Sequence, residues 1–266
     1  MKSHARVVVI GGGVVGVSTL YHLAKKGWSD VVLVERKELT SGSTWHAAGL
    51  LPLFNMSYSV GQIHKYSVKF YQELQKETGM DVGFRNVSNI RLASNQERMD
   101  EFRQYAGVAS TIGVQVDFLT PEQVLDYWPM ANIEGLVGAI RHPQDGYIQP
   151  ADLTQALARG ARDRGAEIYR NTAVTAITRS DDGLWVVSTD KGDITCEFVV
   201  NAAGLWAPEV SRMVGLEIPS IAGEHSHILF EAIDVVVERD TFLPLVRDPD
   251  RSIYIRQEMD SLILGL

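Results

Sequence analysis

Apolar residues near the start of the chain follow first a strand pattern and then a helix pattern. Residues 6–10, RVVVI, form a largely β-branched run, which is typical of a strand covered on both faces of a parallel sheet. From Val14 to Lys26 the apolar side chains recur at helical spacing, and Gly27 follows as a stop signal. A second apolar run, Val31 to Glu35, comes next. The pattern predicts a strand, helix, strand unit with a right-handed parallel crossover.

A similar order of patterns returns in the second half of the chain. Pro150 opens an amphipathic helix that we expect to reach about Arg164, because Gly165 follows as a stop. Three or four strands come next, with turns at SDDG and DKGD. The last of these strands is apolar and runs into the small residues 201–204, NAAG. We therefore expect a second set of strands that belongs with the first unit.

The remaining segments predict a second domain of mixed structure. Residues 58–141 hold two helical stretches and short strands such as NIRLAS. Near the end, SIYIRQEMDSLILGL predicts two strands joined by a tight turn at Met259 to Ser261. Alternation in the first of these strands places Tyr254 and Arg256 on one face. No repeat or low-complexity linker is visible, so we expect two interleaved domains.

Three glycines stand where the first strand meets the first helix. Gly11, Gly13 and Gly16 have the spacing G-x-G-x-x-G, which permits a tight turn, close approach of a pyrophosphate and close helix packing. The helix N-terminus then offers N–H groups and a positive dipole end to the phosphates. Glu35 follows 19 residues after Gly16, where a carboxylate can accept ribose hydroxyls and would repel a 2′-phosphate. The alternative is a glycine-rich turn without a ligand.

Composition and charge narrow the class of protein. Of the 266 residues, 45% are hydrophobic and one is a cysteine, Cys196, which excludes an internal disulfide and a multi-cysteine metal site. The net charge of −8 without a basic stripe argues against nucleic acid. No apolar run approaches the ~20 residues of a membrane helix, and the first strand begins too early for a signal peptide. We predict a cytoplasmic protein, or one of the mitochondrial matrix after processing, without a metal.

Four stretches together resemble a known family. They are VVVIGGGVVGVSTLYHLAKKGWSDVVLVERKELTSGSTWHAAGL, DGYIQPADLTQALARGA, VVNAAGLWA and YIRQEMDSLILGL. These are similar to the FAD-dependent amine oxidoreductases of the D-amino-acid oxidase superfamily. The nearest branch holds dimethylglycine and sarcosine dehydrogenases and a catalytically silent relative, the pyruvate dehydrogenase phosphatase regulatory subunit. The resemblance implies FAD as cofactor and oxidative demethylation of an N-methylated amino acid, with hydride passing from the N-methyl carbon to flavin N5.

The resemblance also implies a fold and a domain plan. We expect an α/β protein in which a Rossmann-like FAD-binding domain is interleaved with an α+β substrate domain on a mainly antiparallel sheet. The FAD-binding segments are predicted at residues 1–57 and 144–216, and the substrate segments at 58–143 and 217–266. Family members continue with more substrate domain and a closing FAD segment, whereas SLILGL ends without a turn or cap. The sequence is therefore expected to be an N-terminal fragment, inactive by itself if FAD binding needs the closing segment.

The stretch SGSTWHAAG places two large rings in a turn of small residues. In covalent members of the branch, the histidine of the TWHAAG motif is bonded to the 8α-methyl group of the flavin, and this position is His46. A flexible turn can lie along the flavin, with Trp45 as an apolar wall. The alternative is that His46 only forms hydrogen bonds within its loop.

Further cofactor contacts follow from the resemblance. Ser43 and Thr44 would serve the pyrophosphate, or would be ordinary turn residues. The NAAG segment would bring the chain back beside the dinucleotide, or would be a simple turn, and Val174 would lie near the adenine. The predicted cofactor-binding residues are Gly11, Gly13, Val14, Val15, Gly16, Glu35, Arg36, Ser43, Thr44, His46, Ala48, Gly49, Leu50, Val174, Ala202, Ala203, Gly204 and Trp206.

Three residues are predicted to serve the amine. GEHSHILFE resembles the family strand in which a histidine faces the substrate, and this position is His225, although it could be an ordinary strand histidine. A histidine titrates near neutrality, so it can accept the ammonium proton. Tyr254 matches the active-site tyrosine of the family. Arg256 could pair with a substrate carboxylate or be a solvated strand arginine. Relatives often carry a tyrosine where this chain has His227, which leaves the amine open.

Two other classes of function stay open at this point. A regulatory flavoprotein without catalysis is one, although the joint presence of His46, His225 and Tyr254 argues against it. An NAD dehydrogenase is the other, but it would leave STWHAAG unexplained. The predicted partners are a small N-methyl amine and an electron acceptor, which could be oxygen, a flavoprotein or a quinone. No nucleic acid and no membrane span are expected.

Overall fold

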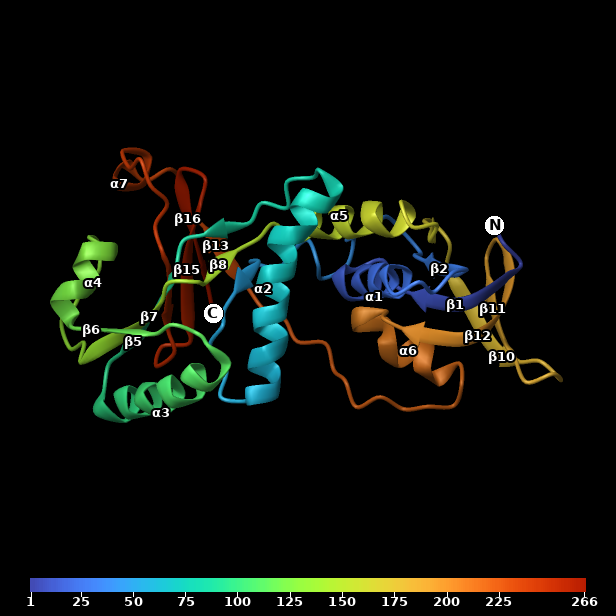
Figure 1. The fold of residues 1–266 in the computed structure, drawn as a ribbon, viewed down its shortest axis with the longest axis horizontal. Helices are drawn as coiled ribbons and strands as arrows, with labels where there is room; N and C mark the ends of the chain where they lie inside the picture. Colours follow the sequence, from blue (N-terminus) through green and yellow to red (C-terminus); the bar gives the residue numbers. More distant parts are fainter. The chain divides into compact units, whose positions relative to one another are not determined.

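Two sheets of different kinds organise the chain (Figure 1). The computed structural model describes residues 1–266, and backbone contacts divide them into two units. Unit 1 comprises residues 1–49, 71–83 and 149–222, and unit 2 comprises residues 50–70, 84–148 and 223–266. Residues 71–83 of unit 1 lie inside the range 58–143 that the sequence suggested for the substrate domain. Both units are therefore assembled from three separate segments.

The sheet of unit 1 is built around four parallel strands. Its order is β10-β11-β12-β1-β2-β9, in which β12, β1, β2 and β9 are parallel and β10 and β11 are antiparallel. The strands are β1 (His4–Ile10), β2 (Val31–Val34), β9 (Glu167–Tyr169), β10 (Val174–Arg179), β11 (Trp185–Thr189) and β12 (Gly192–Asn201). Residues of β1 and β2 are buried on both faces, as their continuous apolar runs predict. The predicted parallel pairing of the first two strands is confirmed.

Two helices of unit 1 lie side by side (Figure 1). They are α1 (Val14–Lys25) and α5 (Pro150–Arg162), and both begin at the predicted residues. A Cβ at Gly160 of α5 would lie 2.7 Å from the ring of Tyr21 in α1, so the absence of a side chain permits this approach. A short 3-10 helix, η1 (Gly204–Trp206), and α6 (Ala207–Arg212) follow β12. α1 contacts β1 and β2, and Val210 of α6 packs against buried residues of the same two strands.

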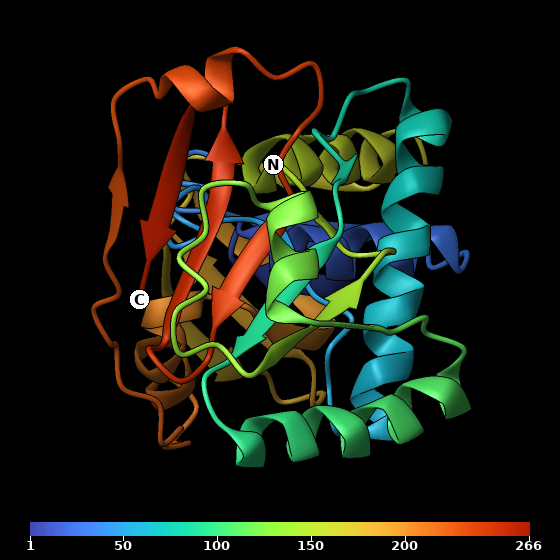
Figure 2. The same cartoon turned by 90° about the vertical axis from the view of Figure 1, so that its left-hand side faces the viewer.

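The main sheet of unit 2 is mostly antiparallel. Its order is β13-β16-β15-β14-β5-β7-β6, and only β14 and β5 pair in parallel. The strands are β5 (Asn89–Ala93), β6 (Asp117–Leu119), β7 (Gly138–His142), β13 (His227–Leu229), β14 (Leu245–Asp248), β15 (Ile253–Glu258) and β16 (Ser261–Gly265). Figure 2 shows β15 and β16, in red, running side by side. A smaller sheet has the order β3 (Leu50–Leu51), β8 (Gly146–Tyr147), β4 (Arg85–Asn86).

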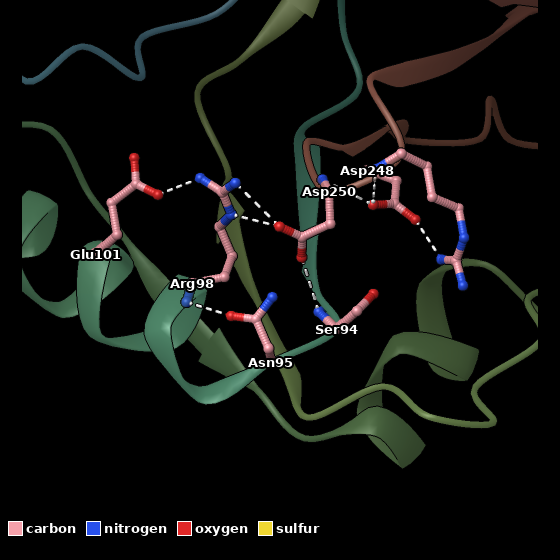
Figure 3. A network of polar contacts seen from close by, with 7 residues as sticks. Ser94, Asn95, Arg98, Glu101, Asp248 and Asp250 are labelled. Carbon is pink, nitrogen blue, oxygen red and sulfur yellow. Dashed lines mark hydrogen bonds and ion pairs between the residues drawn. The ribbon is translucent and has the colours of Figure 1, made fainter.

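Three helices lie wholly in unit 2, and side chains cap the first two of them. They are α3 (Gln96–Ile112), α4 (Pro121–Tyr127) and α7 (Asp234–Val237), and α2 (Tyr58–Thr78) passes from unit 2 to unit 1 after Phe70. Asn95 caps α3 by accepting the Arg98 N–H at 2.8 Å. Arg98 also pairs with Asp250, whose carboxylate accepts the Ser94 N–H. These contacts tie the start of α3 to the β14–β15 turn (Figure 3).

None of the helices has both the length and the apolar character needed to cross a bilayer.

A buried polar cluster beside β5 and β7 was not predicted from the sequence. The carboxylate of Asp145 accepts the Leu53 N–H and the Asn89 amide N–H, each at 3.0 Å. Burial raises the pKa of Asp145 to about 7 against the lowering effect of these hydrogen bonds. Burial, together with the charge of Arg91, lowers the pKa of His142 to about 3, so its imidazole is neutral. These two groups therefore titrate in the folded protein far from their ordinary ranges.

Replacing Asp145 by Asn tests this cluster through the pH dependence of stability. Because the folded pKa of about 7 lies above the unfolded value of 3.8, folded Asp145 holds a proton that the unfolded chain releases. The stability of the parent relative to Asp145→Asn should thus be greatest below about pH 4 and fall by ~1 kcal/mol per pH unit toward pH 7. Urea unfolding of both proteins at pH 5, 6 and 7 measures this difference. Both proteins contain His142, so its contribution cancels in the difference between them. Asp126→Asn, at an exposed aspartate, is the control, and its difference from the parent should not fall with pH in this way. A difference that is constant with pH would contradict the assignment.

Candidate functional site

The loop between β1 and α1 packs directly against the NAAG turn that follows β12. Gly11 has φ +116°, and a Cβ there would overlap the carbonyl oxygen of Ala202. A Cβ at Gly16 would overlap the carbonyl oxygen of Gly11. Ile10 and Asn201 are paired in the sheet, so the two connections leave neighbouring parallel strands at the same edge. Glycine at 11 and 16 is therefore required by contact between backbones.

The N-terminus of α1 is open to an anion. Gly13 occupies the N-cap without a side-chain hydrogen bond, and the first turn has no acidic residue. The Val14 N–H donates to Thr44 Oγ1 at 3.0 Å, which brings the predicted residue Thr44 to the helix end. Free N–H groups and the positive end of the helix dipole favour a phosphate at this position.

Glu35 is fixed by the backbone at the end of β2. Its Oε2 accepts the Gly12 N–H at 2.6 Å, and its Oε1 accepts the Lys37 N–H at 2.8 Å. The side chain is half-buried and lines a cavity. An ionised carboxylate has further lone pairs, so it can accept hydroxyl hydrogens from a ligand while these two bonds remain.

A cavity of about 660 Å³ in unit 1 joins these groups. Its volume is within the range of about 300–1,000 Å³ that is usual for small-molecule sites. At one side the guanidinium of Arg36 lies 3.7 Å from the centroid of the Trp206 ring. Val174 of β10 and Met213 add apolar surface. The lining comes from residues 10–15, 34–37, 41–44, 47, 172–174, 201–207, 209, 210 and 213.

The cavity unites most, but not all, of the residues predicted to bind the cofactor. Those that line it are Gly11, Gly13, Val14, Val15, Glu35, Arg36, Ser43, Thr44, Val174, Ala202, Ala203, Gly204 and Trp206. Those that do not line it are Gly16, His46, Ala48, Gly49 and Leu50. His46 is exposed, and its ring lies 3.9 Å from that of Trp45, which is itself 59% exposed. Trp45 thus contacts His46 and forms no wall of this cavity.

Several lining residues were missed by sequence reasoning. They include Gly12, Lys37, Thr172, Ala173, Leu205 and Met213. Gly12 stands between two predicted glycines, and Thr172 and Ala173 directly precede Val174, so proximity along the chain was the available signal. Met213 had no such signal, because only the packing of α6 against β12 brings it near the cavity.

The predicted amine residues Tyr254 and His225 are neighbours in unit 2. Their rings are nearly parallel, at 10°, with centroids 6.3 Å apart. Tyr254 is buried in β15, whereas His225 is exposed. The sequence suggested that His225 lies in a strand, but β13 begins only at His227. His225 therefore occupies an irregular segment before an edge strand.

Tyr254 lies over a glycine of the neighbouring strand. Tyr254 and Gly265 are directly opposite each other in the β15–β16 pair. A Cβ at position 265 would overlap Cζ, Cε1 and the hydroxyl oxygen of Tyr254. The position of the ring therefore depends on the absence of a side chain at Gly265.

Arg256 is buried and already paired. It is 3% exposed, so the alternative of a solvated strand arginine is wrong. Its Nη2 lies 2.5 Å from Oε2 of Glu258, and its Nη1 donates to the carbonyl of Gln257 at 3.1 Å. Its guanidinium carbon lies 4.8 Å from the centroid of the Tyr147 ring. A substrate carboxylate at Arg256 would have to compete with Glu258.

Gly265→Ala tests the packing of Tyr254. The added methyl group must displace the ring, so we expect a loss of about 1–3 kcal/mol in the free energy of unfolding. In a Tyr254→Ala background the space is open and this loss should disappear. Urea unfolding of the four proteins of this cycle measures the coupling. Gly107→Ala in α3, where a Cβ meets nothing within 4 Å, is the matched control and should not destabilise. An equal loss in both backgrounds would contradict the contact.

Comparison with known proteins gives one consistent result over the whole chain. The family model described as DAO, FAD dependent oxidoreductase, matches residues 6–266. The mitochondrial dimethylglycine dehydrogenase of Rattus norvegicus is 42% identical over 264 residues, which are 99% of this chain and 31% of that protein. The mitochondrial sarcosine dehydrogenase of Mus musculus is 38% identical, over 100% of this chain and 29% of that protein. The mitochondrial pyruvate dehydrogenase phosphatase regulatory subunit of Mus musculus is 35% identical, over 100% of this chain and 30% of that protein.

Solved structures share the fold. The crystal structure of L-proline dehydrogenase from P. horikoshii superposes with a TM-score of 0.89 at 27% identity, and covers 100% of this chain and 70% of that one. Glycine oxidase from Geobacillus kaustophilus gives a TM-score of 0.82 at 28% identity, with 99% and 71% covered. The chain spans less than a third of the length of the curated relatives named above. The predicted α/β fold is confirmed by these neighbours.

Proposed function

The chain belongs to the FAD dependent oxidoreductase family, and on this premise we propose that it serves the oxidative demethylation of an N-methylated amino acid such as dimethylglycine or sarcosine. The observation that carries the proposal is the cavity of unit 1, which gathers the glycine loop, Glu35 and the NAAG turn. The similarity to dimethylglycine and sarcosine dehydrogenases supports the choice of substrate.

The residues of this cavity fit FAD. The open N-terminus of α1, with Gly13 at its N-cap and Thr44 beside it, suits a pyrophosphate. Glu35 would accept ribose hydroxyls, and Val174 would contact the adenine. Ser43 and the residues 202–204 also line the cavity and would contact the cofactor. When bound, FAD would act as the acceptor of a hydride from the carbon next to nitrogen.

Tyr254 and His225 are the proposed residues for the amine. The exposed imidazole of His225 can accept a proton from the substrate ammonium, which leaves the nitrogen lone pair free. The buried Tyr254 provides a flat surface parallel to that imidazole, and its hydroxyl can donate to the substrate. Both groups belong to unit 2 and are held by the sheet edge formed by β13, β16 and β15.

A non-catalytic regulatory flavoprotein is the second candidate. The 35% identity to the pyruvate dehydrogenase phosphatase regulatory subunit over the whole chain favours it. Both candidates require the FAD cavity, so they differ in turnover and not in cofactor binding. The names of these relatives place them in mitochondria, which supports the mitochondrial matrix, while cytoplasm stays the alternative. Oxygen, a flavoprotein or a quinone would reoxidise the cofactor.

We further propose that His46 attaches the flavin covalently. Its imidazole is exposed in a turn of small residues, so it is sterically accessible. The purified protein, precipitated with acid, should retain yellow flavin in the pellet, and His46→Ala should release it to the supernatant. The visible spectra of both fractions measure this. His4→Ala, an exposed histidine of unit 1, is the control and should keep its flavin in the pellet. Release of all flavin from the parent would refute the bond, and colourless protein expressed at the full length of the gene would refute the flavoprotein itself.

Anaerobic reduction of the flavin tests catalysis. Addition of dimethylglycine or sarcosine should bleach the flavin absorbance of the parent protein. Removing the proton acceptor in His225→Gln should slow this reduction by about 10²–10⁴-fold, as is usual for the loss of a general base. His227→Gln, two residues further along, serves as the matched control and should retain most of the rate. A yellow protein that no N-methyl amine bleaches would favour the regulatory candidate.

A further inference from the structure

Trp45 and His46 occupy the centre of a tight turn beside the cavity of unit 1. The Ala47 N–H donates to the Thr44 carbonyl at 3.3 Å, which closes a four-residue β-turn with Trp45 and His46 as its two central residues. Thr44 and Ala47, the outer residues of the turn, both line the cavity, whereas the two central residues do not. The turn therefore begins and ends at the cavity wall, and the two rings are exposed outside it.

The backbone that leads into this turn is held by several contacts. The Thr40 N–H donates to the Gly12 carbonyl at 3.0 Å, and Thr44 Oγ1 accepts a backbone N–H at the start of α1. A Cβ at Gly42 would lie 3.4 Å from Cζ3 of Trp206, which lines the same cavity. The backbone of the turn is therefore fixed relative to the cavity.

The side chain of His46 is less restrained than its backbone. The imidazole is exposed and forms no hydrogen bond and no ion pair. A free histidine side chain has three χ1 positions and a broad, two-fold χ2, so about six orientations compete. The alternative that His46 forms hydrogen bonds within its loop thus finds no partner in the structure. Another contact must select one orientation if the ring is to react at a defined point.

The indole of Trp45 supplies such a contact. Its ring lies against the imidazole, with centroids 3.9 Å apart and planes inclined at 38°. Orientations in which the imidazole would occupy the space of the indole are excluded by this packing, and contact between the flat faces favours the orientation that remains. Trp45 is itself 59% exposed, so its side chain adds little to the apolar core of the fold. Contact with His46 is therefore the feature that distinguishes this tryptophan from an ordinary surface residue.

We propose that Trp45 is a positioning residue for covalent attachment of the flavin, and that it holds the His46 imidazole in the orientation that can react. This inference rests on the proposed bond at His46 and deepens it. In that step a bond forms between an imidazole nitrogen and the 8α carbon, while one N–H and one C–H bond break. The two protons and two electrons that are released are taken up by dioxygen. Trp45 touches neither of the reacting atoms and acts through His46.

The rate of flavin attachment tests this role without any amine. Protein expressed at the full length of the gene in a riboflavin-limited culture is mixed with FAD in aerated buffer, and flavin in the acid pellet is followed over time. Trp45→Ala should slow attachment at saturating FAD by about 3- to 10-fold, because the imidazole then spreads over several orientations. The FAD concentration that gives half the maximal rate should not change. Trp45→Phe, which keeps a flat ring, should stay within about twofold of the parent.

Two controls separate positioning from folding. Phe198→Ala, at an aromatic residue of unit 1 that is 50% exposed and does not line the cavity, should attach flavin at the rate of the parent. Thermal unfolding of Trp45→Ala should have nearly the same midpoint as the parent, because the side chain is exposed.

The outcomes distinguish this inference from the functions on which it rests. Attachment by Trp45→Ala at the rate of the parent would overturn the role of Trp45 and leave the bond at His46 standing. Slower attachment by both Trp45 variants, with a higher half-saturating FAD concentration, would also overturn it and assign the residue to cofactor binding. A parent that attaches no flavin would refute the bond and with it the role of Trp45. Failure of the protein to oxidise an amine would affect none of these measurements.

Discussion

The contact between the β1–α1 loop and the NAAG turn is the constraint on which the cofactor site depends. The Ala202 carbonyl lies where a side chain at Gly11 would be, and the Gly11 carbonyl lies where a side chain at Gly16 would be. These contacts bring the start of α1 close to the end of β12, and both Gly11 and Ala202 line the cavity. A separate hydrogen bond, from the Val14 N–H to Thr44 Oγ1, joins the start of the helix to the next loop of the site.

Backbone N–H groups hold the side chain of Glu35 in place in this site. Glu35 is oriented by two N–H donors, one from the glycine loop and one from its own turn. A carboxylate fixed in this way keeps its direction without a cationic partner. The site is therefore formed by the fold itself, and the residues that a ligand would meet are already oriented.

Unit 2 uses charge in a different manner. On one face of its sheet, Arg256 is neutralised by Glu258 and packed over Tyr147, whereas Arg91 and Arg247 have no such partner. Burial strengthens the effect of each charge, because the surrounding protein screens it less than water does. Asp145 and His142 in the same region have pKa values shifted toward their neutral forms. The result is an excess of positive charge beside Tyr254.

The sequence by itself determined the first strand, helix, strand unit, the helix at Pro150 and the glycine positions, because each of these depends on local periodicity or on the space at a single residue. The motifs around them also led to the FAD dependent oxidoreductase family. Tertiary structure alone decided how Glu35, Thr44, Val174 and Ala202 reach one cavity, since pairing between distant strands leaves no periodic signal in the chain. The start of β13 at His227 depended on which residues could pair with β16, and the adjacency of Arg91 and Arg247 depended on the parallel pairing of β5 with β14. The sequence shows which residues carry a charge. Whether a charged side chain has an ion-pair partner depends on which strands pair in the folded sheet.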